Sequence, residues 1–311
     1  MITDKKKVKL EESLRKTGFT RSKLKYSMNE KFFDRWTRQM AYVLGFTFAD
    51  GNIHRTSLAW DVQLRDKNVL QKIKKFLKAT YPISLQRKSS YRLRINNQIL
   101  IGGAIRVGLL PKKNIRNQLP LIPKNLVRHF VRGYLDGDGW IIMRNRGNNN
   151  KEIDIGFSSG NRKFLEDLKS IIFRNTEILA TQGVRKRLKT TPKKVISVTY
   201  MLEYYTSKAI KIADWLYSNL EKDDLFLDRK HKKYLLAKQY SDFIQTGISK
   251  LFRSVQKKSG KTIKEILEDL YKSKGYKGEK IARILKVHSS SIYRWLARTG
   301  IKYPQRRIKY G

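Results

Sequence analysis

The 311-residue sequence contains no cysteine, few acidic residues and only four histidines. The absence of cysteine excludes disulfide bonds, thiolate zinc sites and cysteine nucleophiles. The histidines are scattered without the spacing of metal ligands, which argues against a histidine-bound metal centre. No run approaches the roughly 20 apolar residues of a membrane span, and the first residues lack the apolar core of a signal peptide. We therefore expect an intracellular protein without a membrane segment.

The charge of the chain is strongly one-sided. It has 69 lysine and arginine residues against 26 acidic residues, a formal net charge of +43. Such an excess repels itself unless a polyanion neutralises it, and it exceeds what solubility requires. Nucleic acid is the expected partner, and an ordinary basic surface is the alternative. The length allows two or three domains with cores of their own.

Two segments read almost alike, Val43–Gly51 (VLGFTFADG) and Val131–Gly139 (VRGYLDGDG). Each runs apolar residues up to a small-Asp-Gly stop, a pattern that predicts a helix with one carboxylate leaving its last turn. Small residues four positions apart in each segment would let the two helix backbones approach closely. We therefore expect Asp50 and Asp138 to lie near each other.

This pairing predicts a metal site. Both carboxylates would sit at helix C-termini, where the helix dipole disfavours anions. A hard cation such as Mg²⁺ between them would relieve that cost, because it prefers oxygen ligands. A single Asp-Gly could be only a helix-terminating turn. Two equivalent copies in one chain favour the paired site.

The two segments open two similar units, each predicted as helix, two strands, helix, two strands, helix. Apolar periodicity predicts helices over 66–78, 99–107, 161–174 and 207–220. The predicted strands are 58–64, 83–88, 91–96, 140–146, 151–157, 184–189 and 195–201, with a turn directly after the first motif. The predicted class is therefore α+β, with antiparallel sheets.

The alternation along these strands predicts one buried and one polar face for each sheet. Leu58, Trp60, Val62 and Leu64 are expected to point into the core. Polar side chains are expected to form a surface for duplex DNA, since arginine and glutamine can pair with base edges. The alternative is an ordinary solvated sheet face. The candidate DNA-binding residues of the sheets are Gln63, Arg65, Gln86, Lys88, Arg92, Arg94, Asn96, Arg144, Arg146, Asp154, Ser158, Arg185, Arg187 and Lys189.

The paired motifs resemble the signature of LAGLIDADG homing endonucleases, in the two-repeat, single-chain form. The likeness covers roughly residues 37–235 and includes the segment GLLPKK that ends at Lys113 and the segment LDRK at 227–230. The family's first motif often has an acidic residue where Phe48 stands here, at a position that is not catalytic.

The resemblance implies a site-specific endonuclease that uses Mg²⁺ to cut both strands of a long DNA target across the minor groove, leaving 3′ overhangs. It implies that Asp50 and Asp138 bind the metal, with the carbonyls of Ala49 and Gly137 beside them. Such enzymes also use a lysine near the site. Lys113 matches it in the first repeat, and Lys194 is our candidate in the second.

The last 50 or so residues resemble a helix-turn-helix of the resolvase or transposase type. Helices are predicted over 262–274, 278–285 and 289–298, with Lys286 where the family often has glycine. The resemblance implies that Ser290, Ser291 and Arg294 face the major groove and that Arg306 and Arg307 form a basic arm. A small helical cap is the alternative.

We therefore divide the chain into a basic N-terminal extension (1–36), a first repeat (37–122), a second repeat (123–239) and a C-terminal helical domain (240–311). We expect a monomer that binds double-stranded DNA. The rival functions are an intron RNA maturase and a non-catalytic DNA-binding regulator with a relic endonuclease fold. Both aspartates are retained, which favours the nuclease over either rival. An intein is not favoured, because the sequence lacks cysteine and a terminal His-Asn pair.

Overall fold

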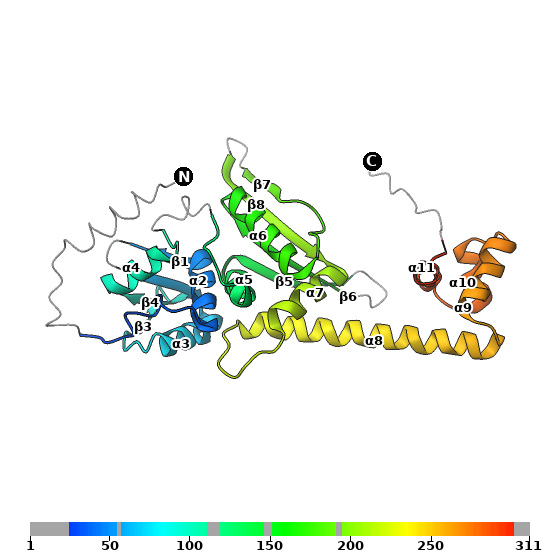
Figure 1. Ribbon diagram of the computed structural model, residues 1–311, viewed down its shortest axis with the longest axis horizontal. Coiled ribbons are helices and arrows are strands. Elements are labelled where there is room, and N and C mark those ends of the chain that lie inside the picture. Colours follow the sequence, from blue (N-terminus) through cyan, green and yellow to red (C-terminus); the bar gives the residue numbers. More distant parts are fainter. Residues whose placement is uncertain (1–24, 55–56, 111–117, 146–150, 191–194, 302–311) are drawn as a thin grey trace. The chain divides into compact units, whose positions relative to one another are not determined.

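The structure is a computed structural model that describes residues 25–54, 57–110, 118–145, 151–190 and 195–301 (Figure 1). The fold is mixed α+β, as predicted. The chain separates into two compact units, Met1–Ala237 and Lys238–Gly311. Among the described residues, no helix has the length and apolar character needed to cross a membrane.

The first repeat contains three helices and one four-stranded antiparallel sheet. Its elements are α2 (Arg38–Asp50), β1 (Gly51–Ile53), β2 (Leu58–Gln63), α3 (Lys67–Phe76), β3 (Ile83–Gln86), β4 (Ser90–Ile95) and α4 (Gln98–Arg106). The strand order is β1-β2-β4-β3. The predicted turn after the first motif is in fact the short strand β1, which pairs with β2.

The second repeat has the same order of elements. They are α5 (Val127–Asp138), β5 (Gly139–Asn145), β6 (Lys151–Ser159), α6 (Arg162–Thr176), β7 (Arg185–Thr190), β8 (Val195–Tyr205) and α7 (Thr206–Tyr217). The strand order β5-β6-β8-β7 repeats that of the first sheet, and all neighbours are antiparallel. Both units therefore have the predicted order of helices and strands.

Side chains fix where several of these helices begin. Thr37, Asn97 and Asn161 each precede a helix, and each accepts a hydrogen bond from the backbone N–H three residues further on. Such caps satisfy an N–H that has no partner within the helix. The sequence thus sets the starts of α2, α4 and α6 locally.

The apolar faces of the strands form the core as predicted, with one exception. Leu58, Trp60 and Val62 are buried, but Leu64 is 46% exposed. The strand ends at Gln63, and the chain turns into a short 3-10 helix over Leu64–Asp66. The alternation therefore stops one residue earlier than the pattern indicated.

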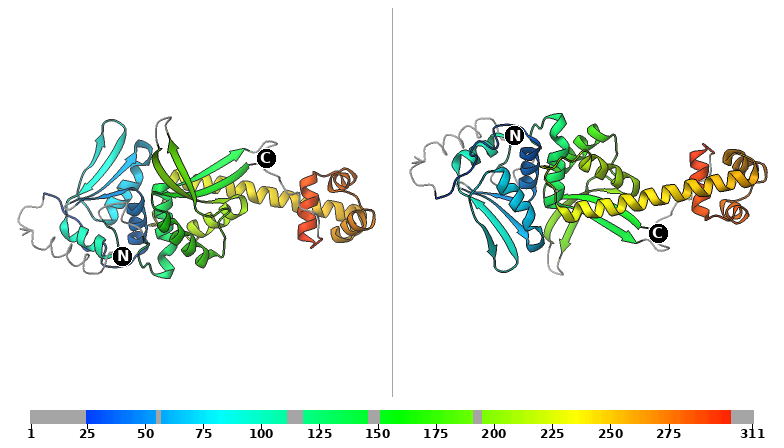
Figure 2. Two further views of the ribbon diagram at one scale, coloured as in Figure 1. Left: turned by 90° about the horizontal axis from the view of Figure 1, so that it is seen from above. Right: turned by 90° about the horizontal axis from the view of Figure 1, so that it is seen from below.

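Helices α2 and α5 lie side by side at the centre of the larger unit, with one sheet on each side of the pair (Figure 2). Glycines allow their backbones to touch. A Cβ added at Gly45 would lie 2.0 Å from the carbonyl oxygen of Phe130, and one at Gly133 would lie 2.1 Å from that of Tyr42. A Cβ at Gly137 would lie 2.3 Å from the Cβ of Ala49. The close approach expected from the small residues is confirmed.

Helix α8 (Asp228–Ser259) was not predicted from the sequence; it has 32 residues and runs from the larger unit into the smaller one. The smaller unit also contains α9 (Ile263–Leu267), a π-helical turn (Glu268–Ser273), α10 (Gly278–Leu285) and α11 (Ser289–Arg298). Thr262 and Glu265 form a capping box at the start of α9. The predicted helix over 262–274 is therefore an α-helical turn that continues as a π-helix.

The glycine contact between α2 and α5 predicts a large, position-specific loss of stability. Gly133→Ala should lower the free energy of unfolding by about 2–4 kcal/mol, because backbone atoms of α2 cannot move aside independently. Gly102→Ala in α4 is the matched control, since its Cβ would meet no atom closer than 3.7 Å. That change should be neutral or stabilise by up to about 1 kcal/mol. Urea denaturation measures both values, and equal effects of the two substitutions would contradict the close contact.

Candidate active site

The two motif helices end next to each other, each on its aspartate. Asp50 is the last residue of α2 and Asp138 the last residue of α5, and both are partly exposed. A Cβ built on Gly137 would lie 3.4 Å from the backbone nitrogen of Asp50. The carboxylates therefore leave adjacent helix ends, as the small-residue pattern predicts.

A buried lysine from α8 also reaches this place. The Nζ of Lys230 donates to three backbone carbonyls at the end of α5: those of Leu135, of Asp136 at 2.9 Å and of Gly139 at 2.7 Å. Burial lowers the pKa of Lys230 to about 8, while the negative charges of Asp136 and Asp50 act in the opposite direction. The negative end of the α5 dipole thus meets a resident ammonium group.

From the sequence we expected a metal alone to offset the negative charge at the helix ends. In the structure the ammonium group of Lys230 offsets part of that charge at the end of α5. A signal for it was present in the sequence. Lys230, Tyr234 and Ala237 follow helical spacing, and all three are buried on one face of α8. A lysine in line with apolar residues indicates a buried cation, which requires specific partners.

The two motifs differ at one buried position, and the structure accounts for the difference. Asp136 of the second motif accepts hydrogen bonds from the Tyr42 hydroxyl and the Leu227 N–H, both at 2.8 Å. Burial raises the pKa of Asp136, and these donors oppose that rise. The equivalent Phe48 of the first motif packs against the ring of Phe130. Only the second repeat therefore places a carboxylate inside the helix pair.

A second buried cation, Arg132, belongs to α5 itself. Arg132 is fully buried and donates to the carbonyls of Leu225 at 2.9 Å and Leu216 at 2.7 Å, and to Nδ1 of His129 at 2.9 Å. Burial, assisted by the positive charge of Arg132, lowers the pKa of His129 to about 3. His129 is therefore a neutral acceptor that fixes the guanidinium group.

The hydrogen bonds that side chains donate around the end of α5 are compatible with a hard cation bound there. The Ser158 hydroxyl donates to the Asp138 carbonyl at 2.7 Å, and Lys230 donates to the carbonyls of Leu135, Asp136 and Gly139. For the Gly137 carbonyl no side-chain donor is found among the described residues. Two carboxylates and this carbonyl form an oxygen-only set, which suits Mg²⁺. Within the described ranges, no group of three or more His, Cys, Asp and Glu residues offers a different metal site.

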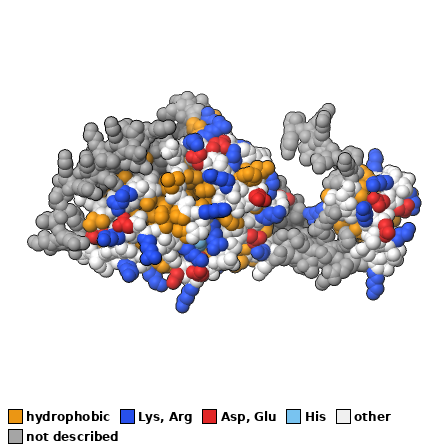
Figure 3. Space-filling model, viewed as in Figure 1, with side chains coloured by type: hydrophobic (Ala, Val, Ile, Leu, Met, Phe, Trp, Pro, Cys, Tyr) orange, Lys and Arg blue, Asp and Glu red, His pale blue; other side chains and the backbone are white. Residues whose placement is uncertain are grey.

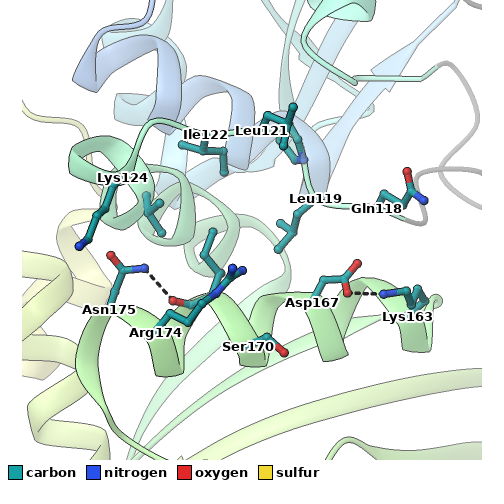
Figure 4. Close-up of a pocket in the computed structure, with 13 residues that line it drawn as sticks. Gln118, Leu119, Leu121, Ile122, Lys124, Lys163, Asp167, Ser170, Arg174 and Asn175 are labelled. Atoms are coloured by element: carbon teal, nitrogen blue, oxygen red, sulfur yellow. Dashed lines mark hydrogen bonds and ion pairs between the residues drawn. The ribbon is translucent and has the colours of Figure 1, made fainter. Parts of the chain in front are cut away.

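A separate cavity of about 730 Å³ lies at the opposite end of α5 (Figure 4). It is lined by residues of the segment 118–124 and by α6, including Leu119, Leu121 and Ile171. Hydrophobic side chains also gather over the middle of the larger unit in Figure 3, with lysine and arginine side chains around them. The lining of the cavity contains one carboxylate, Asp167, which pairs with Lys163. The paired-carboxylate chemistry therefore does not belong to this cavity.

The predicted polar sheet faces exist in the register of the strands. In the first sheet Asp61 lies opposite Arg92, Ala59 opposite Arg94, and both Gln63 and Gln86 opposite Ser90. In the second sheet the backbone register places the described predicted residues on one face, through pairs such as Arg144–Glu152, Ser158–Met201 and Arg185–Met201.

Several predicted contact residues occupy unexpected positions. Asp154 is 2% exposed and forms an ion pair with Arg144, so it is not a surface residue. The Ser158 hydroxyl donates to the backbone carbonyl of Asp138, the last residue of α5. Arg65 lies in the 3-10 helix after β2, and Lys88 lies in the hairpin turn after β3 with a positive φ of 57°. Asn96 is exposed just beyond β4.

Other predicted residues fall outside what the structure describes. These are Lys113, Lys194, Arg146, Arg306 and Arg307. In the smaller unit Ser290 and Arg294 are exposed on α11, but Ser291 is only 8% exposed and faces the core. Lys286 adopts the left-handed conformation with φ 52°, a conformation that glycine adopts without steric cost.

Comparison with known proteins supports the resemblance for the second repeat. Residues 125–211 match the family model of the LAGLIDADG-like domain. The chain is also similar to the probable translation initiation factor IF-2 of Methanocaldococcus jannaschii, with 28% identity over 186 residues. That match covers 55% of this chain and 14% of the length of the relative.

Solved structures of LAGLIDADG homing endonucleases are similar over most of their length. I-LtrWI bound to target DNA is 13% identical with a TM-score of 0.45, covering 71% of this chain and 93% of that chain. I-GzeII in complex with its DNA target is 13% identical with a TM-score of 0.46, covering 68% and 92%. The resemblance of the C-terminal helices to a helix-turn-helix stays a prediction.

The buried His129 predicts an acid-sensitive step in stability. Its pKa is lowered in the folded state, so the unfolded chain takes up a proton first as the pH falls below 6.5. Its contribution to stability is complete above that pH and declines toward pH 3. Between pH 6.5 and pH 5 the wild type should lose about 1.5 kcal/mol more than His129→Gln, which can still accept from Arg132. Urea denaturation at the two pH values measures this, with the surface substitution His54→Gln as control; parallel curves for all three proteins would refute it.

Proposed function

We propose that this protein is a metal-dependent, site-specific DNA endonuclease. The observation that carries the proposal is the pair of glycine-packed helices that end side by side on Asp50 and Asp138. The LAGLIDADG-like domain at residues 125–211 supports it, and so does a net charge of +43. Retention of both aspartates favours cleavage over the rival functions, an intron maturase or a relic regulator, neither of which requires them.

The carboxylates of Asp50 and Asp138, with the carbonyls of Ala49 and Gly137, would hold Mg²⁺. When bound, the cation supplies charge that activates water and stabilises the phosphate transition state. Lys230 holds the end of α5 and so orients Asp138 toward the scissile phosphates. It replaces Lys194 as our candidate lysine for the second repeat, while Lys113 stays the candidate for the first.

The two polar sheet faces would hold the DNA on both sides of this site. Arginine and glutamine side chains on these faces can pair with base edges, and the general positive charge can neutralise phosphates. Cleavage of both strands across the minor groove would leave 3′ overhangs. We also propose that α11 enters a neighbouring major groove, with Ser290 and Arg294 exposed toward it. One chain carries both repeats, so the active species is proposed to be a monomer.

Removal of either aspartate should separate binding from cleavage. Asp50→Asn and Asp138→Asn should each slow double-strand cleavage about 10³-fold or more, because the lost metal charge is worth several kcal/mol in the transition state. DNA binding should stay within a few-fold of wild type. A target is first obtained by selecting cleaved sequences from a random DNA library with Mg²⁺. Cleavage by gel and binding by fluorescence anisotropy then compare the variants.

The exposed Asp223 provides the control for these variants, Asp223→Asn, since its backbone carbonyl accepts from Gln39 in the first turn of α2, at the opposite end of that helix from Asp50. That variant should cut at the wild-type rate. Wild-type cutting by Asp50→Asn or Asp138→Asn would refute the metal-site assignment. A wild-type protein that splices intron RNA but selects no DNA target would favour the maturase instead.

Lys230 should contribute to the rate through the end of α5. Lys230→Gln should slow cleavage about 10-fold to 100-fold, as is usual when a residue that orients a metal ligand is removed. Lys233→Gln is the matched control, because Lys233 lies one turn further along α8 and also donates to a backbone carbonyl, that of Ile141 at 3.2 Å. Cleavage rates are compared after circular dichroism has verified that each variant unfolds cooperatively. Equal rates for the two variants would argue against the role of Lys230.

A further inference from the structure

Three arginines on the polar sheet faces are each bound by a carboxylate on the neighbouring strand. Asp61 on β2 binds Arg92 on β4, Asp154 on β6 binds Arg144 on β5, and Glu203 on β8 binds Arg185 on β7. The pattern occurs in both sheets and uses three different strand pairs. It therefore does not follow from the local geometry of one hairpin.

The pair in the first sheet has the geometry of a bidentate fork. The two residues lie directly opposite each other in the register. The Nε of Arg92 donates to Oδ1 of Asp61 at 2.7 Å, and its NH2 group donates to Oδ2 at 3.0 Å. Because the carboxylate takes this edge of the guanidinium group, the NH1 group is the part that can reach a base.

The two pairs in the second sheet combine a buried acid with a half-exposed base. The side chains of Asp154 and Glu203 are 3% and 6% exposed, whereas those of Arg144 and Arg185 are 50% and 47% exposed. The NH2 group of Arg185 also donates to the hydroxyl of Tyr205 at 3.3 Å. Asp154 binds Arg144 at Nε, whereas Glu203 binds Arg185 at the terminal NH2 group; in both pairs the acid is buried and about half of the arginine side chain is exposed.

Neither stability nor affinity explains these acids well. A buried ion pair gives little net stability compared with apolar residues of similar size. A carboxylate on a surface that receives phosphates also lowers the attraction for DNA. What such a pair does provide is orientation, since it removes rotational freedom from a long side chain before the ligand arrives.

We propose that Asp61, Asp154 and Glu203 are specificity-determining positioning residues, which fix their arginines for hydrogen bonding to guanine in the major groove. This inference rests on the proposed DNA-binding function of the sheets. Arg94 and Arg187 lie on the same faces without a carboxylate at ion-pair distance among the described residues. These two make phosphate contacts that carry no sequence information.

The test measures base preference and not only affinity. Asp61 is the residue of choice because its side chain is 40% exposed, so Asp61→Asn is compatible with folding. Competition binding is measured on the selected target and on every single-base variant of it. In Asp61→Asn, discrimination at one guanine position should fall about tenfold. Affinity for an unrelated duplex should rise a few-fold, with a salt dependence steeper by about one unit of slope.

Asp34→Asn is the matched control. Asp34 forms an exposed ion pair with Arg106 at 2.6 Å, and neither residue belongs to a sheet. This variant should raise the affinity for all sequences alike and leave the base preferences unchanged. In an Arg92→Ala background, Asp61→Asn should have no further effect on discrimination, because the carboxylate acts through Arg92.

The possible failures are distinguishable. If a target is selected but Asp61→Asn keeps every base preference of the wild type, the positioning role is wrong and the proposed function stands. If Asp61→Asn and Asp34→Asn change binding identically, the acids are only local charge compensation and the inference is overturned. If the wild-type chain binds and cuts no DNA, both the inference and the proposed function fall.

Discussion

The backbone contact between α2 and α5 is the constraint on which the rest of the structure depends. Gly45 and Gly133 let a carbonyl of each helix occupy the space where a side chain would start. This contact joins the two repeats into one core and brings the two helix ends together. Without it Asp50 and Asp138 would not be neighbours.

Close packing of two helix ends creates an electrostatic problem, and the structure solves part of it within the protein. Carboxylates and carbonyls accumulate at the negative ends of two dipoles. Lys230 and Ser158 donate to carbonyls at the end of α5, and Tyr42 donates to Oδ2 of the buried Asp136. Asp50 and Asp138 stand at the same helix ends and are partly exposed, and we propose that a cation adds further positive charge there.

The sequence predicted the order of helices and strands and the pairing of the motif helices, because these follow from local periodicity and from glycine spacing. It did not predict α8, whose apolar residues are too sparse to mark a helix of that length. It also placed Asp154 on the surface, because alternation reports which face a residue is on and not how deeply its neighbours cover it. Arg144 lies over Asp154. Lys230 was missed because its partners lie about 90 residues earlier in the chain.

The exchange of one residue between the two motifs has a consequence for how such a protein could arise. Tyr42 and Phe130 occupy equivalent positions before the motifs, and so do Phe48 and Asp136. A pair of second repeats would set Phe130 against Asp136 and leave a buried carboxylate without its hydroxyl donor. A pair of first repeats would leave the Tyr42 hydroxyl facing a phenyl ring. At this position each half is therefore matched to the other half and not to a copy of itself.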